Sequence, residues 1–286
     1  MKKLLLLLFG LAAVAGLAVM AACGDDDDAT PSPSPTASTS ATATEAPLTG
    51  SITVFAASSL TASFTQIGRD FEAAHPGSKV TFNFGGSQDL RTQLEQGAEA
   101  QVFASADTTQ MDLAEQSGVV TGDSSVFAHN RLVIIVPKDN PAGIQVPQDL
   151  GKSGVKLILA ADTVPVGKYA RKFLDAASAD ASYGAGYKDA VLGNVVSDAS
   201  NVKEVSSAVQ LGEADAGIVY VTDVTSDISD DVATVDIPDA VNQIATYPIA
   251  LTPAGAEDAT AQGFVDYVLS DAGQSTLAAF GFMKGQ

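Results

Sequence analysis

The 286-residue sequence contains one cysteine, two histidines and far fewer basic than acidic residues. With Cys23 as the only cysteine, the chain can form no internal disulfide and no zinc site built from several thiolates. Its 15 lysines and arginines against 34 aspartates and glutamates give a net charge of −19. Because nucleic-acid binding needs a basic face, we expect no nucleic-acid partner.

Residues suited to catalysis are also scarce. Serines at strand-to-helix turns can be hydrolase nucleophiles, but the Gly-x-Ser-x-Gly motif of that class is absent. His75 and His129 are not close in sequence to a candidate serine. The acidic residues show neither EF-hand nor histidine-cluster spacing, which favours a solvated surface over a metal site. We therefore predict no enzyme, no catalytic residue and no cofactor, with a serine hydrolase as the least favoured alternative.

Residues 1–22 have the pattern of an export signal. Lys2 and Lys3 precede an apolar run from Leu4 to Ala22, and small residues come directly before Cys23. This arrangement resembles a bacterial lipobox, whose cysteine is acylated and becomes the new N-terminus. An uncleaved membrane anchor is the alternative, since the apolar run is nearly long enough to span a bilayer. Both interpretations place the protein outside the cytoplasm, held to the outer face of the cytoplasmic membrane.

Residues 23–49 are predicted to be a disordered tether that begins at the lipidated Cys23. This segment contains the acidic run Asp25 to Asp28 and several prolines among alanine, serine and threonine, with no aromatic side chain. Such a composition cannot bury an apolar core. The folded part of the protein is therefore expected to begin at Gly50.

From Gly50 onward, short apolar runs alternate with helical patterns. The runs 132–136, 157–160 and 218–221 suit strands that are buried on both faces, as in parallel sheets. Apolar residues also recur at helical spacing, in one segment at Leu60, Phe64, Ile67 and Phe71, in others at Leu90 and Leu94, at Ala170, Phe173, Leu174 and Ala177, and at Val202, Val205 and Val209.

This alternation predicts an α/β fold in which helices cover a mostly parallel sheet. We expect a discontinuous lobe I of residues 50–136 and 246–286 and a lobe II of residues 137–245, with crossovers near Pro137 and Pro248. In such sheets, ligands bind beyond the carboxyl ends of the strands.

Two predicted helix starts follow strands and carry serine. Ser58 or Ser59 is expected to cap the helix that starts there, and Ser87 to cap the helix that follows the strand 80–84. The free backbone N–H groups, the hydroxyl donors and the positive end of the helix dipole would meet at one point. This combination is suited to binding an anion.

Two further helix starts and a tyrosine extend the pattern. Pro165 is expected at the first position of one helix, and Asn201, with Glu204 three residues later, at the cap of another. Each helix start carries about half a positive charge, so four of them would offset about two negative charges. Tyr220, at the end of a strand, could add a phenolic donor. The predicted ligand is a doubly charged oxyanion.

Several motifs, in this order, resemble the molybdate-binding proteins of ABC importers, which have the two-lobed type II periplasmic binding fold with the ligand in the cleft. The resemblance covers nearly all of residues 50–286. The motifs are Ile52-Thr-Val-Phe-Ala-Ala-Ser-Ser-Leu60, Phe84-Gly-Gly-Ser87, Val102-Phe-Ala-Ser-Ala-Asp107, Val164-Pro-Val-Gly167, Gly217-Ile-Val-Tyr220 and Phe280-Gly-Phe282.

The resemblance implies a set of binding residues. In that family, backbone N–H groups, two serine hydroxyls and a tyrosine hold the oxyanion, without a metal ion. Matched motif by motif, the implied ligand-binding residues are Ser59, Ser87, Val166, Val202 and Tyr220, with Ser58 as a possible additional one. Gln101 departs from the family, which usually has aspartate there, and Val166 stands where a smaller residue is common.

The chemistry of this set predicts selectivity. A site made only of donors suits a fully deprotonated dianion such as molybdate, tungstate or sulfate, whereas hydrogen phosphate would need an acceptor for its proton. We expect molybdate and tungstate to bind, and a sulfate-binding or other oxyanion-binding protein is the nearest alternative.

The resemblance also implies a mechanism and partners. A monomeric protein would bind the oxyanion on one lobe, close the other lobe over it and deliver it to an ABC transporter permease. The alternative of a different class is a sensory or structural surface lipoprotein that has kept this fold.

Overall fold

A computed structural model describes residues 48–285. The predicted signal peptide, the lipidation site at Cys23 and almost all of the predicted tether lie outside the described residues. The described residues belong to one compact unit.

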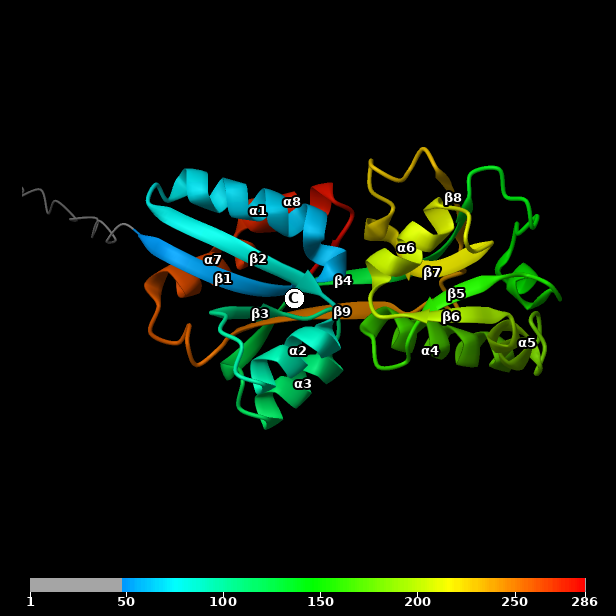
Figure 1. The fold of residues 1–286 in the computed structure, drawn as a ribbon, viewed down its shortest axis with the longest axis horizontal. Helices are drawn as coiled ribbons and strands as arrows, with labels where there is room; N and C mark the ends of the chain where they lie inside the picture. The colour runs from blue at the N-terminus through cyan, green and yellow to red at the C-terminus, as the bar shows by residue number, and fades with distance from the viewer. Residues whose placement is uncertain (1–47, 286) are drawn as a thin grey trace, which may run out of the picture. The chain divides into compact units, whose positions relative to one another are not determined.

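Strands and helices from the two ends of this unit form one group, on the left in Figure 1. The strands are β1 (Gly50–Ala57), β2 (Ser78–Gly85), β3 (Val102–Ala104), β9 (Ile244–Leu251) and the short β10 (Met283–Lys284). The helices are α1 (Thr61–Ala74), α2 (Ser87–Glu95), α3 (Thr108–Gln116), α7 (Ala259–Leu269) and α8 (Asp271–Ala279), and the 3-10 turn η1 (Ser58–Leu60) precedes α1.

The middle of the chain forms the second group, on the right in Figure 1. Its strands are β5 (Leu157–Ala160), β6 (Val195–Ala199), β7 (Ala216–Tyr220) and β8 (Val232–Asp236). Its helices are α4 (Pro165–Ala179), α5 (Tyr187–Gly193) and α6 (Val202–Gln210), with the 3-10 turns η2 (Pro147–Gly151) and η3 (Val221–Asp223).

The long strand β4 (Thr121–Pro137) and strand β9 connect the two groups into a sheet of order β2-β1-β3-β9-β4-β7-β5-β6. β1 pairs in parallel with β2 and β3, and β5 pairs in parallel with β6 and β7, as predicted. β4 and β9, in contrast, make only antiparallel pairs within residues 48–285. The sheet is therefore mixed at its centre.

The antiparallel pairing of β4 could not be predicted from its apolar run at residues 132–136. The prediction of a parallel strand is wrong here, since the run pairs with β7 and β8 in antiparallel register. It is nevertheless buried on both faces, because α4 and α6 pack on it from opposite sides (Figure 1). Burial on both faces, rather than parallel pairing, produces a continuous apolar run.

Strand β4 changes its partner without ending. It pairs with β9 as far as Arg131 and with β7 from Leu132, five positions before its end at Pro137. This change of partner lies within the strand, before the crossover that is expected near Pro137. The limits of lobes I and II stay a prediction.

The predicted helix face of α1 packs into the core. Leu60, Phe64, Ile67 and Phe71 are all fully buried, and Phe64 and Phe71 stack edge-on against Phe264 of α7. The helix ends at Ala74, before a proline and a glycine at residues 76 and 77, which cannot continue it. This packing fixes the start of α1 at the carboxyl end of β1.

Candidate functional site

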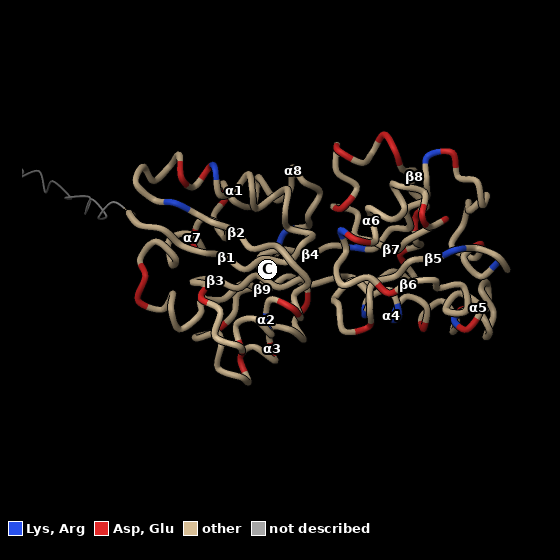
Figure 2. Tube along the Cα trace, viewed as in Figure 1, with Lys and Arg blue, Asp and Glu red and all other residues tan. Residues whose placement is uncertain are grey.

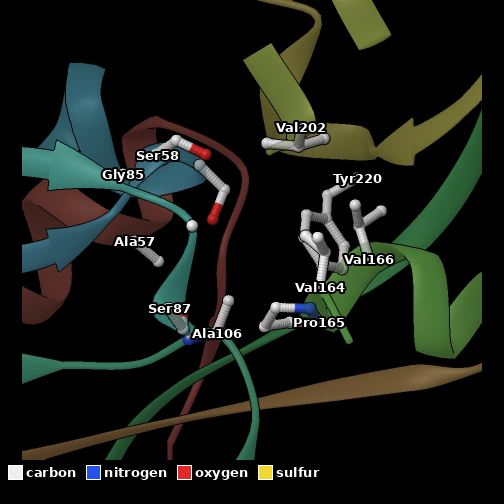
Figure 3. Close-up of a pocket in the computed structure, with 12 residues that line it drawn as sticks. Ala57, Ser58, Gly85, Ser87, Ala106, Val164, Pro165, Val166, Val202 and Tyr220 are labelled. Carbon is white, nitrogen blue, oxygen red and sulfur yellow. Dashed lines mark hydrogen bonds between the residues drawn. The ribbon is translucent and has the colours of Figure 1, made fainter. Parts of the chain in front are cut away.

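A small cavity lies where the two groups of strands and helices face each other. Its empty space is about 200 Å³, including adjoining open solvent. In Figure 3, Ser58, Gly85 and Ser87 lie on one side and Val202 and Tyr220 on the other. The full lining is Ala57, Ser58, Ser59, Gly85, Gly86, Ser87, Ala106, Val164, Pro165, Val166, Val202 and Tyr220.

All of the residues matched to ligand binding line this cavity. The structure brings Ser59, Ser87, Val166, Val202 and Tyr220 together, with Ser58 beside them. The segments that carry them follow the carboxyl ends of β1, β2, β5 and β6 or, for Tyr220, end β7. They lie where an α/β sheet places its ligands.

Ser59 has a different local role from the one predicted. Neither Ser58 nor Ser59 caps a helix with its side chain, because the chain first makes the 3-10 turn η1 before α1 begins at Thr61. The Ser59 hydroxyl instead lies 3.1 Å from the phenol oxygen of Tyr247, a buried residue of β9. The Ser59 side chain therefore does not cap a helix, and its position is fixed by Tyr247, which is distant in sequence.

Ser87 is likewise not a cap. Gly86 occupies the cap position of α2 and Ser87 is the first helical residue. The Ser87 hydroxyl oxygen accepts a hydrogen bond of 3.1 Å from the backbone N–H of Ala106. The cap prediction fails because the two glycines carry the chain through the turn one residue earlier than expected.

The starts of α4 and α6 agree with the sequence. Pro165 is the first residue of α4, and the side chain of Asn201 accepts from the N–H groups of Lys203 and Glu204 at the start of α6. The N–H groups of Val166 and Val202 have no acceptor within residues 48–285. Both are first-turn N–H groups, whose partners lie outside the helix.

Gly167 allows α4 to start this close to β5. A Cβ atom there would lie 2.1 Å from the carbonyl oxygen of Ala161, so no other residue fits. The glycine of the Val164 to Gly167 motif therefore sets the position of the Val166 N–H.

Tyr220 is the most unusual residue of the site. Its side chain is only 1% exposed, and its hydroxyl oxygen has no hydrogen-bond partner within the described residues. Burial, followed by the neighbouring Tyr247, raises the pKa of this phenol well above its usual value, so it keeps its proton. A buried hydroxyl without a partner is unfavourable, and here it borders the cavity, where a ligand could accept from it.

Among the described residues, no charged side chain lines the cavity, although two buried carboxylates lie next to its walls. Asp107 is paired with Lys168 at 3.3 Å and Asp223 with Lys203 at 3.6 Å. Burial raises the pKa of Asp223 to about 6, against the lowering effect of Lys203. Each lysine offsets a negative charge that would otherwise repel an anion.

Polar contacts join the two walls across the mouth. Gln88 Nε2 donates to the carbonyl of Ser200 at 2.9 Å, and Gln110 Nε2 donates to that of Thr163 at 3.2 Å. Lys168 Nζ also hydrogen bonds the Thr109 hydroxyl, beside its pair with Asp107. The structure is therefore closed over the cavity.

The sequence reasoning missed Tyr247, Asp107, Lys168 and Asp223. Asp107 belongs to one of the motifs that carry the family resemblance, and Tyr247 directly precedes Pro248, where a crossover is expected. Their partners lie 61 and 188 positions away in the chain, so no local pattern could have revealed the contacts.

Between residues 48 and 285, no three histidine, cysteine, aspartate or glutamate side chains come close enough to hold a metal ion. The helices of this same part are all too short or too polar to cross a bilayer.

Fold and site together define a two-lobed α/β binding protein of the type II periplasmic class. Residues 52–283 match the family described as bacterial extracellular solute-binding protein, and the chain belongs to this family. This membership supports binding rather than catalysis, in agreement with the prediction that the protein is not an enzyme.

Relatives with assigned names extend this finding. The chain is 40% identical over 234 residues to the molybdate-binding protein ModA of Mycobacterium tuberculosis, covering 82% of this chain and 85% of the relative. It is 29% identical to a solved substrate-binding domain of a putative molybdenum ABC transporter from Clostridium difficile, with a TM-score of 0.61 and coverage of 82% and 99%.

The fold is shared more widely. The periplasmic molybdate-binding protein of Azotobacter vinelandii gives a TM-score of 0.70 at 20% identity, covering 82% of this chain and 100% of that one. The sulfate-binding protein SubI of Mycobacterium tuberculosis gives 0.73 at 18% identity, covering 82% and 86%. At these identities the likeness shows the fold alone, and the two-lobed fold class predicted from the sequence is confirmed.

Proposed function

We propose that the protein is an extracytoplasmic substrate-binding protein that captures molybdate or tungstate and delivers it to an ABC transporter permease. The observation that carries this proposal is the buried hydroxyl of Tyr220, which has no partner within residues 48–285 and borders a cavity that these residues line with donors and with no charged side chain. The 40% identical ModA relative supports molybdate as the ligand.

The proposed binding set is Ser59, Ser87, Val166, Val202 and Tyr220, with Ser58 as an additional candidate. The serine and tyrosine hydroxyls would donate to the oxyanion from opposite walls, and the two valines would contribute backbone N–H groups. Hydrogen bonds to a charged group are each worth roughly 1.5–3 kcal/mol, and a water-poor cavity strengthens them.

Selectivity follows from the lining of the cavity. Neither a carboxylate nor a histidine lines it, so the proton of hydrogen phosphate would meet few acceptors. Sulfate has no such proton and would differ from molybdate mainly in size. A sulfate-binding function is therefore the second candidate, favoured by the shared fold of SubI.

Capture would end in closure. Ser59 and Ser87 lie on one wall, and the contacts of Gln88 and Lys168 across the mouth would hold the other wall over the ligand. The closed form would then dock on the permease, and a lipid on Cys23 would keep the monomeric protein at the outer face of the cytoplasmic membrane. A surface lipoprotein without a transport role would bind no oxyanion.

Calorimetric titration of the purified protein with molybdate, tungstate, sulfate and phosphate tests the proposal. We expect molybdate and tungstate to bind tightly and, at a hundredfold excess over the dissociation constant, to stabilise the fold by about 2.7 kcal/mol. Tighter binding of sulfate would change the ligand but keep the site. If none of the four ions bound, the proposal would be wrong.

A further inference from the structure

The two serine hydroxyls of the cavity each meet a protein hydrogen-bond donor. The oxygen of Ser87 accepts from the backbone N–H of Ala106 at 3.1 Å, and a backbone N–H can only donate. The Ser87 hydroxyl hydrogen is therefore left to point elsewhere, and the cavity is beside it. Ser87 is fixed by the backbone as a donor to the ligand.

The arrangement at Ser59 depends on a chain of side chains. The amide oxygen of Asn130 accepts from the N–H of Arg131 at 2.9 Å, which fixes the orientation of the amide. The Asn130 Nδ2 group then faces the Thr222 hydroxyl at 2.7 Å and the phenol oxygen of Tyr247 at a longer 3.4 Å. Because Nδ2 can only donate, the Tyr247 oxygen accepts from it.

The hydrogen of the Tyr247 phenol has one acceptor within residues 48–285. That acceptor is the Ser59 hydroxyl oxygen at 3.1 Å. Tyr247 is fully buried, and burial raises the pKa of its phenol well above the usual value, so the proton stays on the oxygen. When Tyr247 donates to Ser59, the Ser59 hydrogen is free for the cavity.

We propose that Tyr247 is a specificity-determining residue, which keeps the Ser59 hydroxyl oriented as a donor and so excludes oxyanions that carry a proton. This inference rests on the proposed function and assigns a role to a residue that does not line the cavity. An anion with an acidic hydrogen needs an acceptor in the site. The Ser59 oxygen could accept that hydrogen only if the Ser59 hydroxyl turned its own hydrogen toward Tyr247.

Such a reversal would leave the buried Tyr247 hydrogen without an acceptor. Leaving a buried donor unsatisfied is unfavourable by an amount that corresponds to about 5- to 150-fold in affinity. Replacing Tyr247 by phenylalanine removes that hydrogen and allows Ser59 to turn either way. Discrimination against protonated anions should then fall, while the cavity lining is unchanged.

The test compares phosphate with sulfate, which are close in size but differ in carrying a proton near neutral pH. Both are measured as competitors of molybdate by calorimetry on the purified protein, wild type and Tyr247→Phe. We expect molybdate to bind up to about tenfold more weakly in the variant, since one neutral hydrogen bond is lost. The affinity for phosphate relative to sulfate should rise at least fivefold.

Two further variants make the result specific. Ser59→Ala combined with Tyr247→Phe should lose the gain in relative phosphate affinity, because the acceptor oxygen is gone. Tyr187→Phe removes a buried phenol that donates to the Pro147 carbonyl at 2.5 Å, outside the cavity, and should leave the ratio as in the wild type.

The outcomes separate this inference from the proposed function. A folded Tyr247→Phe protein that binds molybdate but shows an unchanged phosphate-to-sulfate ratio would overturn the role of Tyr247 alone. A gain that persists without the Ser59 hydroxyl would also overturn it. A wild-type protein that binds none of these anions would overturn the proposed function as well.

Discussion

Replacing Tyr220 by phenylalanine should change ligand affinity and stability in opposite directions. In the closed form, the Tyr220 hydroxyl is buried and has no partner within the described residues, so without a ligand it does not stabilise this form. In the proposed complex, the same hydroxyl donates to the oxyanion. One substitution therefore removes an unfavourable group from the free protein and a favourable contact from the complex.

The magnitudes follow from the surroundings of the hydroxyl. Burying a polar group without a partner is unfavourable by roughly 1–3 kcal/mol, so ligand-free Tyr220→Phe should be at least as stable as the wild type and up to this amount more stable. A hydrogen bond to a charged group is worth roughly 1.5–3 kcal/mol, so the molybdate dissociation constant should rise by about 10- to 150-fold.

Urea unfolding of the ligand-free protein and calorimetric titration with molybdate measure the two effects. Tyr187→Phe is the matched control, because its phenol is also buried but donates to a carbonyl outside the cavity. That control should lose roughly 0.5–1.5 kcal/mol of stability, the usual contribution of a hydrogen bond, and keep the wild-type affinity.

The result that would refute this reasoning is a Tyr220→Phe protein that binds molybdate as the wild type does. A marked loss of stability in the ligand-free variant would also contradict it, because the hydroxyl would then have a partner in the free protein.

Three further substitutions test the walls of the site. Ser87→Ala should weaken molybdate binding by roughly 1.5–3 kcal/mol in the same titration, and unchanged affinity would remove Ser87 from the binding set. Gly86→Ala places a Cβ atom 2.7 Å from the Ser200 carbonyl of the opposite wall, so it should hinder closure and speed molybdate release in stopped-flow experiments. Burial raises the pKa of Asp223 from 3.8 to about 6, so the folded protein binds this proton more tightly than the unfolded chain. This group should therefore lower the free energy of unfolding by about 2 kcal/mol as the pH rises from 4 to 6, and Asp223→Asn should lack that contribution in urea titrations.

The helices were predictable because their signals are local. The spacing of Leu60, Phe64 and Ile67 identifies the buried face of α1. Pro165 as the first residue of α4 and Asn201 as the cap of α6 start these helices where expected. Since helix starts that follow strands gather at one edge of a sheet, the sequence also indicated where a site would form.

The rest depended on contacts between distant parts of the chain. Strand pairing joins residues of β4 to partners 82 to 130 positions away, so β4 could not be distinguished from a parallel strand by its apolar run. The prediction that the Ser59 side chain caps a helix was wrong for a similar reason. Ser59 has the right residue type for a cap, but its hydroxyl is engaged by Tyr247, which no pattern in the neighbouring sequence reveals.

The net charge of −19 would repel the proposed dianion at long range, and the structure limits this repulsion at the site. Aspartate and glutamate are distributed over both groups of elements in Figure 2, where solvent and salt screen them from the site. The two buried carboxylates next to the cavity, Asp107 and Asp223, are each paired with a lysine. Helix starts and hydroxyls then supply the attraction at short range, without a mobile cation. The affinity for the oxyanion should therefore depend on the position of each donor more than on net charge. A substitution that displaces the donors on one wall of the cavity should lower this affinity more than a substitution that neutralises a surface carboxylate.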